Sequence, residues 1–178
     1  ILCEKPVALS LEQVDAMIAA VERAGVIAMV AQVIRFWPQY VVIRELLQSG
    51  ALGQPLIAKA ARLASAPRWG NWFADPALSG GAVLDLHIHD LDFVCWLFGR
   101  PRSVYAVGAQ SATGAWDDVV SSLDFGAVKA VVEASFLMPA GFPFTMAFRL
   151  AGSQACVDFR LGGTTQVDKR DQAATELV

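Results

Sequence analysis

The 178-residue chain contains 55% hydrophobic and 17% charged residues and has a formal net charge of −3. No apolar run reaches the ~18 residues of a membrane span, and no basic stripe alternates with aromatic residues, so neither a membrane nor a nucleic acid is an expected partner. Cys3, Cys95 and Cys156 are an odd number and lie far apart, which argues against a disulfide framework or a structural metal site. The reducing cytoplasm is therefore the expected location.

The N-terminal segment has the pattern of an α/β unit. Residues 1–3 resemble the end of a buried strand, and residues 26–33 form an apolar run, broken only by Gln32, that is typical of a strand covered on both faces. Between these two segments, Ser10 and Gln13 have the spacing of a helix capping box, and apolar residues recur at helical spacing up to Gly25. The order strand, helix, strand indicates an α/β arrangement for residues 1–33.

The remainder of the chain predicts a different, α+β architecture. Pro38 suits the first position of a helix over residues 39–48. A strand over residues 56–64 and a loop over residues 65–78 follow. Beyond Pro101, five apolar segments without intervening helices are predicted to be strands: residues 104–109, 119–125, 128–137, 145–151 and 155–159. We expect an open, mostly antiparallel sheet, arranged as a meander, with the helices on one face.

Residues 80–99 hold both histidines of the chain within an otherwise apolar run that is typical of a helix. Helical spacing places Asp85, His89 and Asp92 on one face and His87 almost opposite to them. For Asp92, two roles stay open: orienting His89 or capping a neighbouring group. A narrow polar stripe on an apolar body predicts that this helix lines a cleft.

Lys5, Asp85 and His89 are the candidate catalytic residues. Pro6 favours an extended conformation at Lys5, after a strand end, where doubly wound sheets bind their ligands. An imidazole can take up a proton near neutral pH, and a carboxylate one helical turn away can orient it. The three residues together suit removal of a proton from a substrate hydroxyl while another group accepts a hydride. The alternatives are an exposed i,i+4 pair for Asp85 and His89, and an ordinary surface lysine for Lys5.

Three motifs, EKP, RFWPQY and SGGAVLDLHIHDLDFVCWLFG, closely resemble the Gfo/Idh/MocA oxidoreductases, which act mostly on sugars and polyols with NAD or NADP. The resemblance implies that Lys5 lies beside the nicotinamide and the substrate, that Glu4 lies near the cofactor ribose, and that Pro6 follows a cis bond. It also implies that His89 is the acid/base and that Asp85 positions the reacting hydroxyl. His87 departs from the family, which often has glycine there.

The resemblance further implies a domain organisation. We expect residues 1–33 to be the C-terminal remnant of a Rossmann domain, its last βαβ piece, and residues 34–178 to be a substrate-binding and oligomerisation domain, truncated at its C-terminus. No G-x-G-x-x-G turn precedes EKP, so this fragment is expected to be inactive and to bind NAD(P) weakly. The parent enzyme would oxidise a sugar, a sugar acid or a polyol. It would form a homo-oligomer through its sheet face.

Several residues have two interpretations. Arg35 can bind an anionic group of the substrate or of the cofactor, or it can pair with a carboxylate. Trp69 and Trp72 can stack on a sugar ring or pack against the protein as plugs. Gly80 and Gly81 can receive a phosphate or allow close packing of the helix.

Two rival functions follow from other features. In a strand, His87 and His89 would point the same way and hold the metal of a hydrolase, although the chain has no third histidine. An apolar sheet face also suits a dimerisation or binding module without catalysis.

Overall fold

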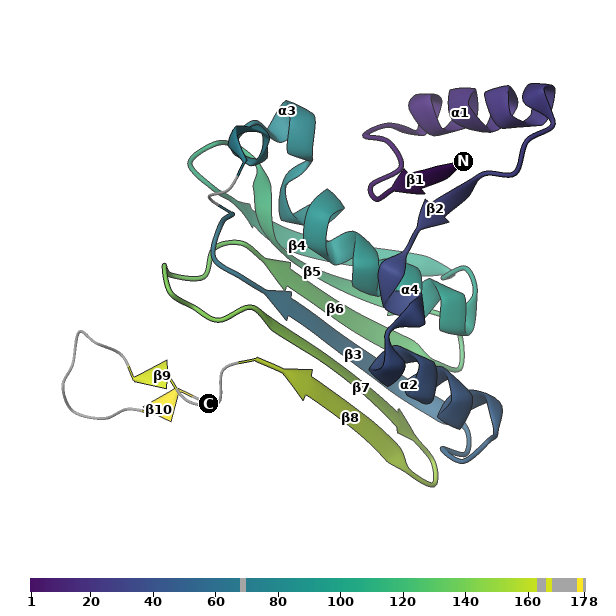
Figure 1. The fold of residues 1–178 in the computed structure, drawn as a ribbon. Coiled ribbons are helices and arrows are strands. Elements are labelled where there is room, and N and C mark those ends of the chain that lie inside the picture. The colour runs from purple at the N-terminus through teal and green to yellow at the C-terminus, as the bar shows by residue number, and fades with distance from the viewer. Residues whose placement is uncertain (68–69, 163–165, 168–175, 178) are drawn as a thin grey trace.

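The computed structural model describes residues 1–67, 70–162, 166–167 and 176–177. The N-terminal segment forms a βαβ unit, with β1 (Leu2–Glu4), α1 (Leu11–Ala24) and β2 (Met29–Ala31), in which the two strands pair in parallel. Figure 1 shows this unit at one side of the molecule, with β2 leading towards α2. Among the described residues, no helix is both long and apolar enough to cross a membrane.

A reciprocal cap begins α1, as the sequence predicts. The Ser10 hydroxyl accepts a hydrogen bond from the Gln13 amide (3.3 Å), and the Gln13 side chain accepts one from the Leu9 amide (3.0 Å). Gly25 ends the helix in a left-handed conformation, with φ of 61°. The helix predicted up to Gly25 is therefore confirmed.

The second strand is shorter and less covered than expected. Only Met29–Ala31 pair with β1, because β1 itself offers only three residues to the ladder. The next turn, Val33–Phe36, is already 3₁₀-helical. Ile27 is 89% exposed and Met29 is 52% exposed, so in this chain the segment is not buried on both faces. The expectation of a fully covered strand over residues 26–33 is wrong for the structure as it stands.

The remaining helices form at the predicted places. Helix α2 (Pro38–Gln48) begins at the expected proline. The predicted loop contains a 3₁₀ turn, Asn71–Ala74, and the one-turn helix α3 (Pro76–Ser79). The predicted helix in residues 80–99 consists of a π-helical turn, Val83–His87, followed by α4 (Ile88–Phe98).

Within the described residues, six strands form the main sheet, in the order β4-β5-β6-β3-β7-β8. Their bounds are β3 (Pro55–Leu63), β4 (Ser103–Gln110), β5 (Trp116–Asp124), β6 (Lys129–Ser135), β7 (Thr145–Gly152) and β8 (Cys156–Leu161). A separate antiparallel pair consists of β9 (Gln166–Val167) and β10 (Glu176–Leu177).

The predicted meander is wrong at one step. Strand β3 lies between β6 and β7, parallel to the former and antiparallel to the latter, so the chain must cross over β3 to pass from β6 to β7. Every other neighbouring pair in this sheet is antiparallel. The predicted α+β class, with a mostly antiparallel sheet, is confirmed.

Helices α2 and α4 cover one face of the sheet (Figure 1), and the core lies between the two layers. Tyr40 of α2 and Phe93 of α4 are fully buried, and their rings meet edge to face at 4.8 Å between centroids. Phe148 of β7 packs on Phe93 at 5.0 Å. This packing holds α4 against the sheet and so fixes the position of its first turn.

Candidate active site

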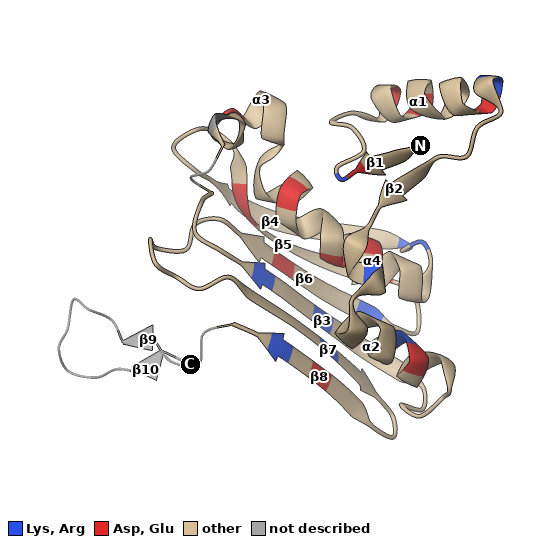
Figure 2. Ribbon diagram, in the orientation of Figure 1, with Lys and Arg blue, Asp and Glu red and all other residues tan. Residues whose placement is uncertain are grey.

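A pocket of about 470 Å³ opens where the end of β1, the π-helical turn and the first turn of α4 meet β3. Its ionisable lining residues are Glu4, Lys5, Arg62, Asp85 and His89. Figure 2 shows acidic positions along the π-helical turn and α4, and charged positions at the end of β1 beside them. The structure therefore gathers in one hollow the three residues that the sequence selected for catalysis.

An ion pair joins the N-terminal unit to the helix segment. Lys5 Nζ lies 2.6 Å from Asp85 Oδ1 and also donates to the backbone oxygen of Asp85 at 2.8 Å. The two side chains are 17% and 16% exposed, so this pair is largely withdrawn from solvent. Lys5 follows β1 directly and precedes a cis peptide bond to Pro6, as the resemblance implied. Glu4 also lines the pocket, whereas Pro6 is not among its described lining residues.

His89 lies in the first turn of α4 and is 9% exposed. Burial lowers its pKa to about 3, and the positive charges of Arg62 and Lys5 add to this effect. Its buried Nδ1 has no hydrogen-bond partner among the described residues. At neutral pH the imidazole is therefore uncharged, which is the state that can accept a proton from a hydroxyl.

Arg62 is a pocket residue that the sequence did not single out. Alternation along β3 turns Ala58, Ala60 and Arg62 towards the helices, and the Arg62 guanidinium is only 2% exposed. It donates to both oxygens of the fully buried Asp90, at 2.8 and 3.0 Å, and to the Tyr40 hydroxyl at 3.0 Å. The sequence signal for this pair was an arginine at a position of β3 that alternation groups with Ala58 and Ala60, and a carboxylate next to His89.

Arg62 and Asp90 form an ionised, bidentate salt bridge. Burial favours the neutral form of each group and raises the pKa of Asp90, and the charge of Arg62 opposes that rise. Burial alone would lower the pKa of Arg62, but the charge and hydrogen bonds of Asp90 outweigh it and raise that pKa. Because both Asp90 oxygens accept N–H bonds, the carboxyl has the geometry of a carboxylate. Burial raises the pKa of Tyr40 to about 12, so its hydroxyl keeps its proton.

Arg35 does not line the pocket. Its Nε donates to Asp92 at 2.7 Å, and its guanidinium lies 5.2 Å from the centre of the Trp96 ring. Of the two interpretations of Arg35, the structure therefore favours pairing with a carboxylate. Asp92 is the partner of Arg35 and does not orient His89. Binding of substrate by Arg35 stays a prediction without support from this geometry.

His87 turns away from the pocket. Its Nε2 lies 2.8 Å from the Ser121 hydroxyl oxygen, and burial lowers the His87 pKa to about 4. Because the segment is helical, His87 and His89 lie on different sides of it, so the strand geometry that a metal hydrolase would need is not formed. The described residues contain no group of three His, Cys, Asp or Glu side chains that is arranged to hold a metal ion.

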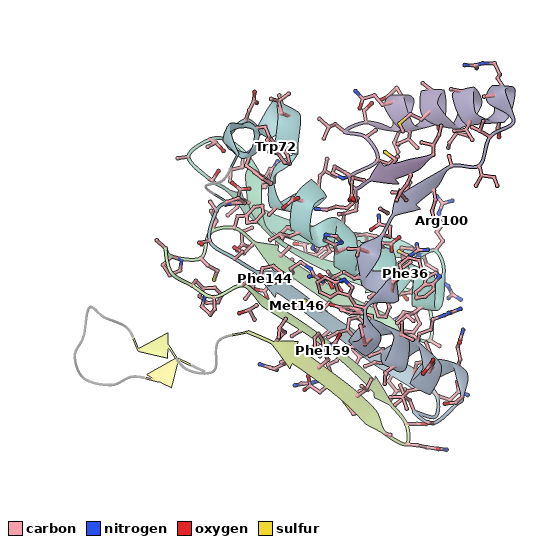
Figure 3. The ribbon with its side chains drawn as sticks, in the orientation of Figure 1. Phe36, Trp72, Arg100, Phe144, Met146 and Phe159 are labelled. Atoms are coloured by element: carbon pink, nitrogen blue, oxygen red, sulfur yellow. The ribbon has the colours of Figure 1, made fainter. Side chains whose placement is uncertain are left out.

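Aromatic side chains form much of the pocket wall: Trp37, Trp72, Phe73 and Phe144. The Trp72 ring stacks on the Phe73 ring at 3.8 Å. Figure 3 shows Trp72 near α3 and Phe144 close to the start of β7. Trp69, the other tryptophan considered from the sequence, lies outside the described residues.

The paired glycines before the helix are explained by close packing. A Cβ at Gly81, where φ is 64°, would lie 3.0 Å from Asp117 Oδ1, and one at Gly80 would clash with the Leu84 side chain. Asp117 Oδ1 accepts a hydrogen bond from the Ala82 amide at 3.1 Å, so a protein carboxylate already occupies the place of an anion. The structure favours the packing interpretation over a phosphate site.

Curated proteins include clear relatives of this chain. It is 35% identical to trans-1,2-dihydrobenzene-1,2-diol dehydrogenase of Danio rerio over 137 residues. The aligned segment covers 74% of this chain and 40% of that relative. The protein of the same description from Mus musculus is 36% identical over 128 residues, 69% of this chain and 37% of that relative. The chain spans about 40% of the length of these curated relatives.

Solved structures share the fold. A probable dehydrogenase from Thermotoga maritima superposes with a TM-score of 0.77 at 26% identity, covering 99% of this chain and 56% of that one. GenD2 from gentamicin A biosynthesis, in complex with NAD, superposes with a TM-score of 0.80 at 27% identity. The superposition covers 97% of this chain and 52% of the GenD2 chain. Residues 40–158 match the family described as GFO/IDH/MocA C-terminal domain. With the α+β sheet and these relatives, that match shows that the chain belongs to the GFO/IDH/MocA family.

Proposed function

We propose that this chain provides the substrate site of an NAD(P)-dependent dehydrogenase that oxidises a hydroxyl of a sugar, sugar acid or polyol. The curated relatives are named diol dehydrogenases, and the GenD2 structure contains NAD, which supports the same chemistry here. The carboxyl end of β1, with Glu4 and Lys5 at the pocket, is where the nicotinamide end of such a cofactor fits. When bound, NAD(P) supplies the acceptor for the hydride.

The domain division is part of this proposal. Residues 1–33 would be the last βαβ piece of a dinucleotide-binding domain, and residues 34–178 would belong to the substrate domain. The exposure of apolar side chains supports this division: between 52% and 89% of the surface is exposed at Leu2, Ile27 and Met29. Apolar strand residues of this kind are normally covered by the neighbouring elements of a larger sheet. Because residues 1–178 contain no G-x-G-x-x-G turn, we expect this chain alone to be inactive and to bind NAD(P) weakly.

The described residues divide the proton chemistry between them. His89, uncharged at neutral pH, accepts the proton of the substrate hydroxyl. Asp85 and Lys5 hold that oxygen, and the ammonium stabilises the negative charge that develops on it as the proton leaves. The C–H bond on the same carbon breaks with its electron pair as the C=O bond forms, so the substrate loses one proton and one hydride.

One observation carries this proposal: Lys5 Nζ lies 2.6 Å from Asp85 Oδ1, although the two residues are 80 positions apart, in a pocket that also contains His89. Both side chains line this pocket and are largely buried, unlike those of an incidental surface pair. The contact joins the segment assigned to the cofactor with the segment assigned to the substrate.

The test is replacement of His89 in the full-length protein. We expect His89→Ala to lower kcat by ~10²–10⁴-fold, the usual contribution of a general base, while NADH binding changes little. His87→Gln is the matched control, because glutamine can keep the hydrogen bond to Ser121 outside the pocket. Unchanged turnover in His89→Ala, or equal losses in both variants, would contradict the assignment of His89.

The sheet face opposite the helices is proposed as the surface of a homo-oligomer. By the strand register, Tyr105 and Val107 of β4 point to that face, and they are 70% and 53% exposed. Buried apolar area of this kind stabilises sheet-to-sheet association. Sedimentation of the full-length protein should give a dimer or larger species, and Tyr105→Lys should weaken it; a monomer at all concentrations would contradict this surface.

A further inference from the structure

Each cationic side chain in the pocket lining or next to it forms an ion pair with an aspartate. Of the described residues that line it, Lys5 is paired with Asp85, and Arg62 is paired with Asp90. Arg35, just outside, is paired with Asp92. A pocket with a free guanidinium or ammonium would attract an anionic substrate, whereas each of these charges already has its counter-charge.

Arg62 shows this most clearly. It lies in the pocket lining, yet its Nε and one terminal nitrogen are committed to Asp90, and that same nitrogen also donates to Tyr40. Its other terminal nitrogen donates to the Met146 sulfur at 3.4 Å, which is a weak acceptor. Met146 and Phe144, at the start of β7, lie close to each other in Figure 3, and Phe144 is part of the pocket wall. The free donor capacity of Arg62 is therefore suited to a neutral hydroxyl.

The remaining charge of the described pocket is negative. Lys5 and Arg62 are each neutralised by an aspartate, and His89 is uncharged. Glu4 contributes a carboxylate that forms no ion pair with another described residue. A carboxylate or phosphate that enters this hollow loses hydration and meets no net positive charge in return. A neutral hydroxyl loses much less hydration and can accept or donate hydrogen bonds to the same side chains.

We propose that Asp90 is a specificity-determining residue: by cancelling Arg62, it makes the site select uncharged ring polyols and reject their carboxylate or phosphate counterparts. This rests on the proposed dehydrogenase function and narrows its substrate class. Asp90 is fully buried and acts through Arg62 rather than by touching the substrate. The aromatic wall formed by Trp37, Trp72 and Phe144 fits the same class, because such rings stack on the apolar C–H face of an uncharged ring.

The experiment compares matched pairs in the full-length protein: glucose with glucuronate, galactose with galacturonate, and myo-inositol with myo-inositol 1-phosphate. Formation of NAD(P)H gives kcat/KM, and calorimetry in the presence of NADH gives affinity without turnover. In the wild type we expect the neutral member to be preferred by at least ~10-fold in each pair that is used or bound. Preference for an anionic member would overturn the proposal without any variant.

Two variants on the same helix distinguish the specific role of Asp90 from the general effect of removing one negative charge. Asp90→Asn uncovers the charge of Arg62 and should shift the neutral-to-anionic ratio towards the anion by at least ~10-fold. Asp92→Asn removes an equally paired carboxylate outside the pocket and should leave the ratio unchanged. Equal shifts in both variants, or no shift in a folded Asp90→Asn, would overturn the role of Asp90.

The same measurements test the dehydrogenase function and the charge selectivity independently of each other. Preferential binding of neutral members without any NAD(P)H formation would contradict the dehydrogenase function and support the charge selectivity. Oxidation of the anionic member of a pair in preference to the neutral one would support the dehydrogenase and contradict the selectivity. If Asp90→Asn does not fold, the Arg62→Met/Asp90→Leu double variant, which keeps the net charge, should retain the preference for neutral substrates.

Discussion

Removing Arg62 alone should destabilise the protein far more than removing both members of its pair. Arg62 and Asp90 are 2% and 0% exposed, so Arg62→Met leaves a carboxylate in the core without its counter-charge. Breaking a buried pair in this way costs about 3–5 kcal/mol. Tyr40 can still offer the carboxylate one hydrogen bond, so we expect the lower end, ~3 kcal/mol.

The assay is urea unfolding of the full-length protein, followed by tryptophan fluorescence at pH 7 and pH 5. Arg62→Met/Asp90→Leu is the matched double variant, because two apolar side chains replace the pair, which is often neutral or stabilising. It should recover most of the free energy of unfolding lost in the single variant. Control Lys129→Met breaks an exposed pair with Asp124 and should change the stability by less than ~1 kcal/mol.

The pH dependence gives the sign of the effect. Burial already raises the pKa of Asp90, and loss of Arg62 raises it further. A carboxyl whose folded pKa lies above its unfolded value binds its proton more readily in the folded state, so the folded state loses stability as the pH rises. The loss in free energy of unfolding that Arg62→Met causes should therefore be larger at pH 7 than at pH 5. A loss below ~1 kcal/mol at pH 7, or a double variant as unstable as the single one, would contradict an uncompensated Asp90 charge as the cause of the instability.

Three further predictions concern other parts of the molecule. Lys5→Met should lower kcat/KM by ~10²-fold or more, because the ammonium beside Asp85 is lost; steady-state kinetics with unchanged values would contradict it. Ser10→Ala should lower the free energy of unfolding by ~1 kcal/mol through loss of the α1 cap, whereas Ser49→Ala, beyond the end of α2, should have a smaller effect. His87 and His89 have folded pKa values of about 4 and about 3, below the unfolded value of 6.5, so the unfolded state binds more protons between these limits. Stability should therefore fall as the pH drops from about 6.5 towards 4, and His87→Gln should flatten this dependence in urea titrations.

Much of the local structure could be predicted because it depends on residues close together in the sequence. The Ser10–Gln13 capping box and Pro38 mark helix starts by hydrogen bonds and backbone geometry within one turn. The helical spacing of Asp85 and His89 likewise places both side chains on one face, and the structure directs that face to the pocket.

The errors arise where distant segments decide the outcome. Strand β3 inserts between β6 and β7, which are far from it in the sequence, and nothing in their own patterns indicates a parallel neighbour. The length of β2 is limited by its partner β1 rather than by its own apolar run. The pairing of Arg62 with Asp90 depends on a strand and a helix packing face to face, which spacing along either element does not reveal.

In the proposed mechanism, His89 takes the proton of the reacting hydroxyl while Lys5 and Asp85 hold its oxygen. The most direct measurement is a crystal structure of the full-length protein with NADH and a substrate that it oxidises. We expect a substrate hydroxyl oxygen at about 2.6–3.2 Å from an imidazole nitrogen of His89, with Lys5 Nζ or Asp85 also in hydrogen-bond contact with it. A substrate hydroxyl bound beside the nicotinamide but out of reach of His89 would contradict the role of His89 as the proton acceptor.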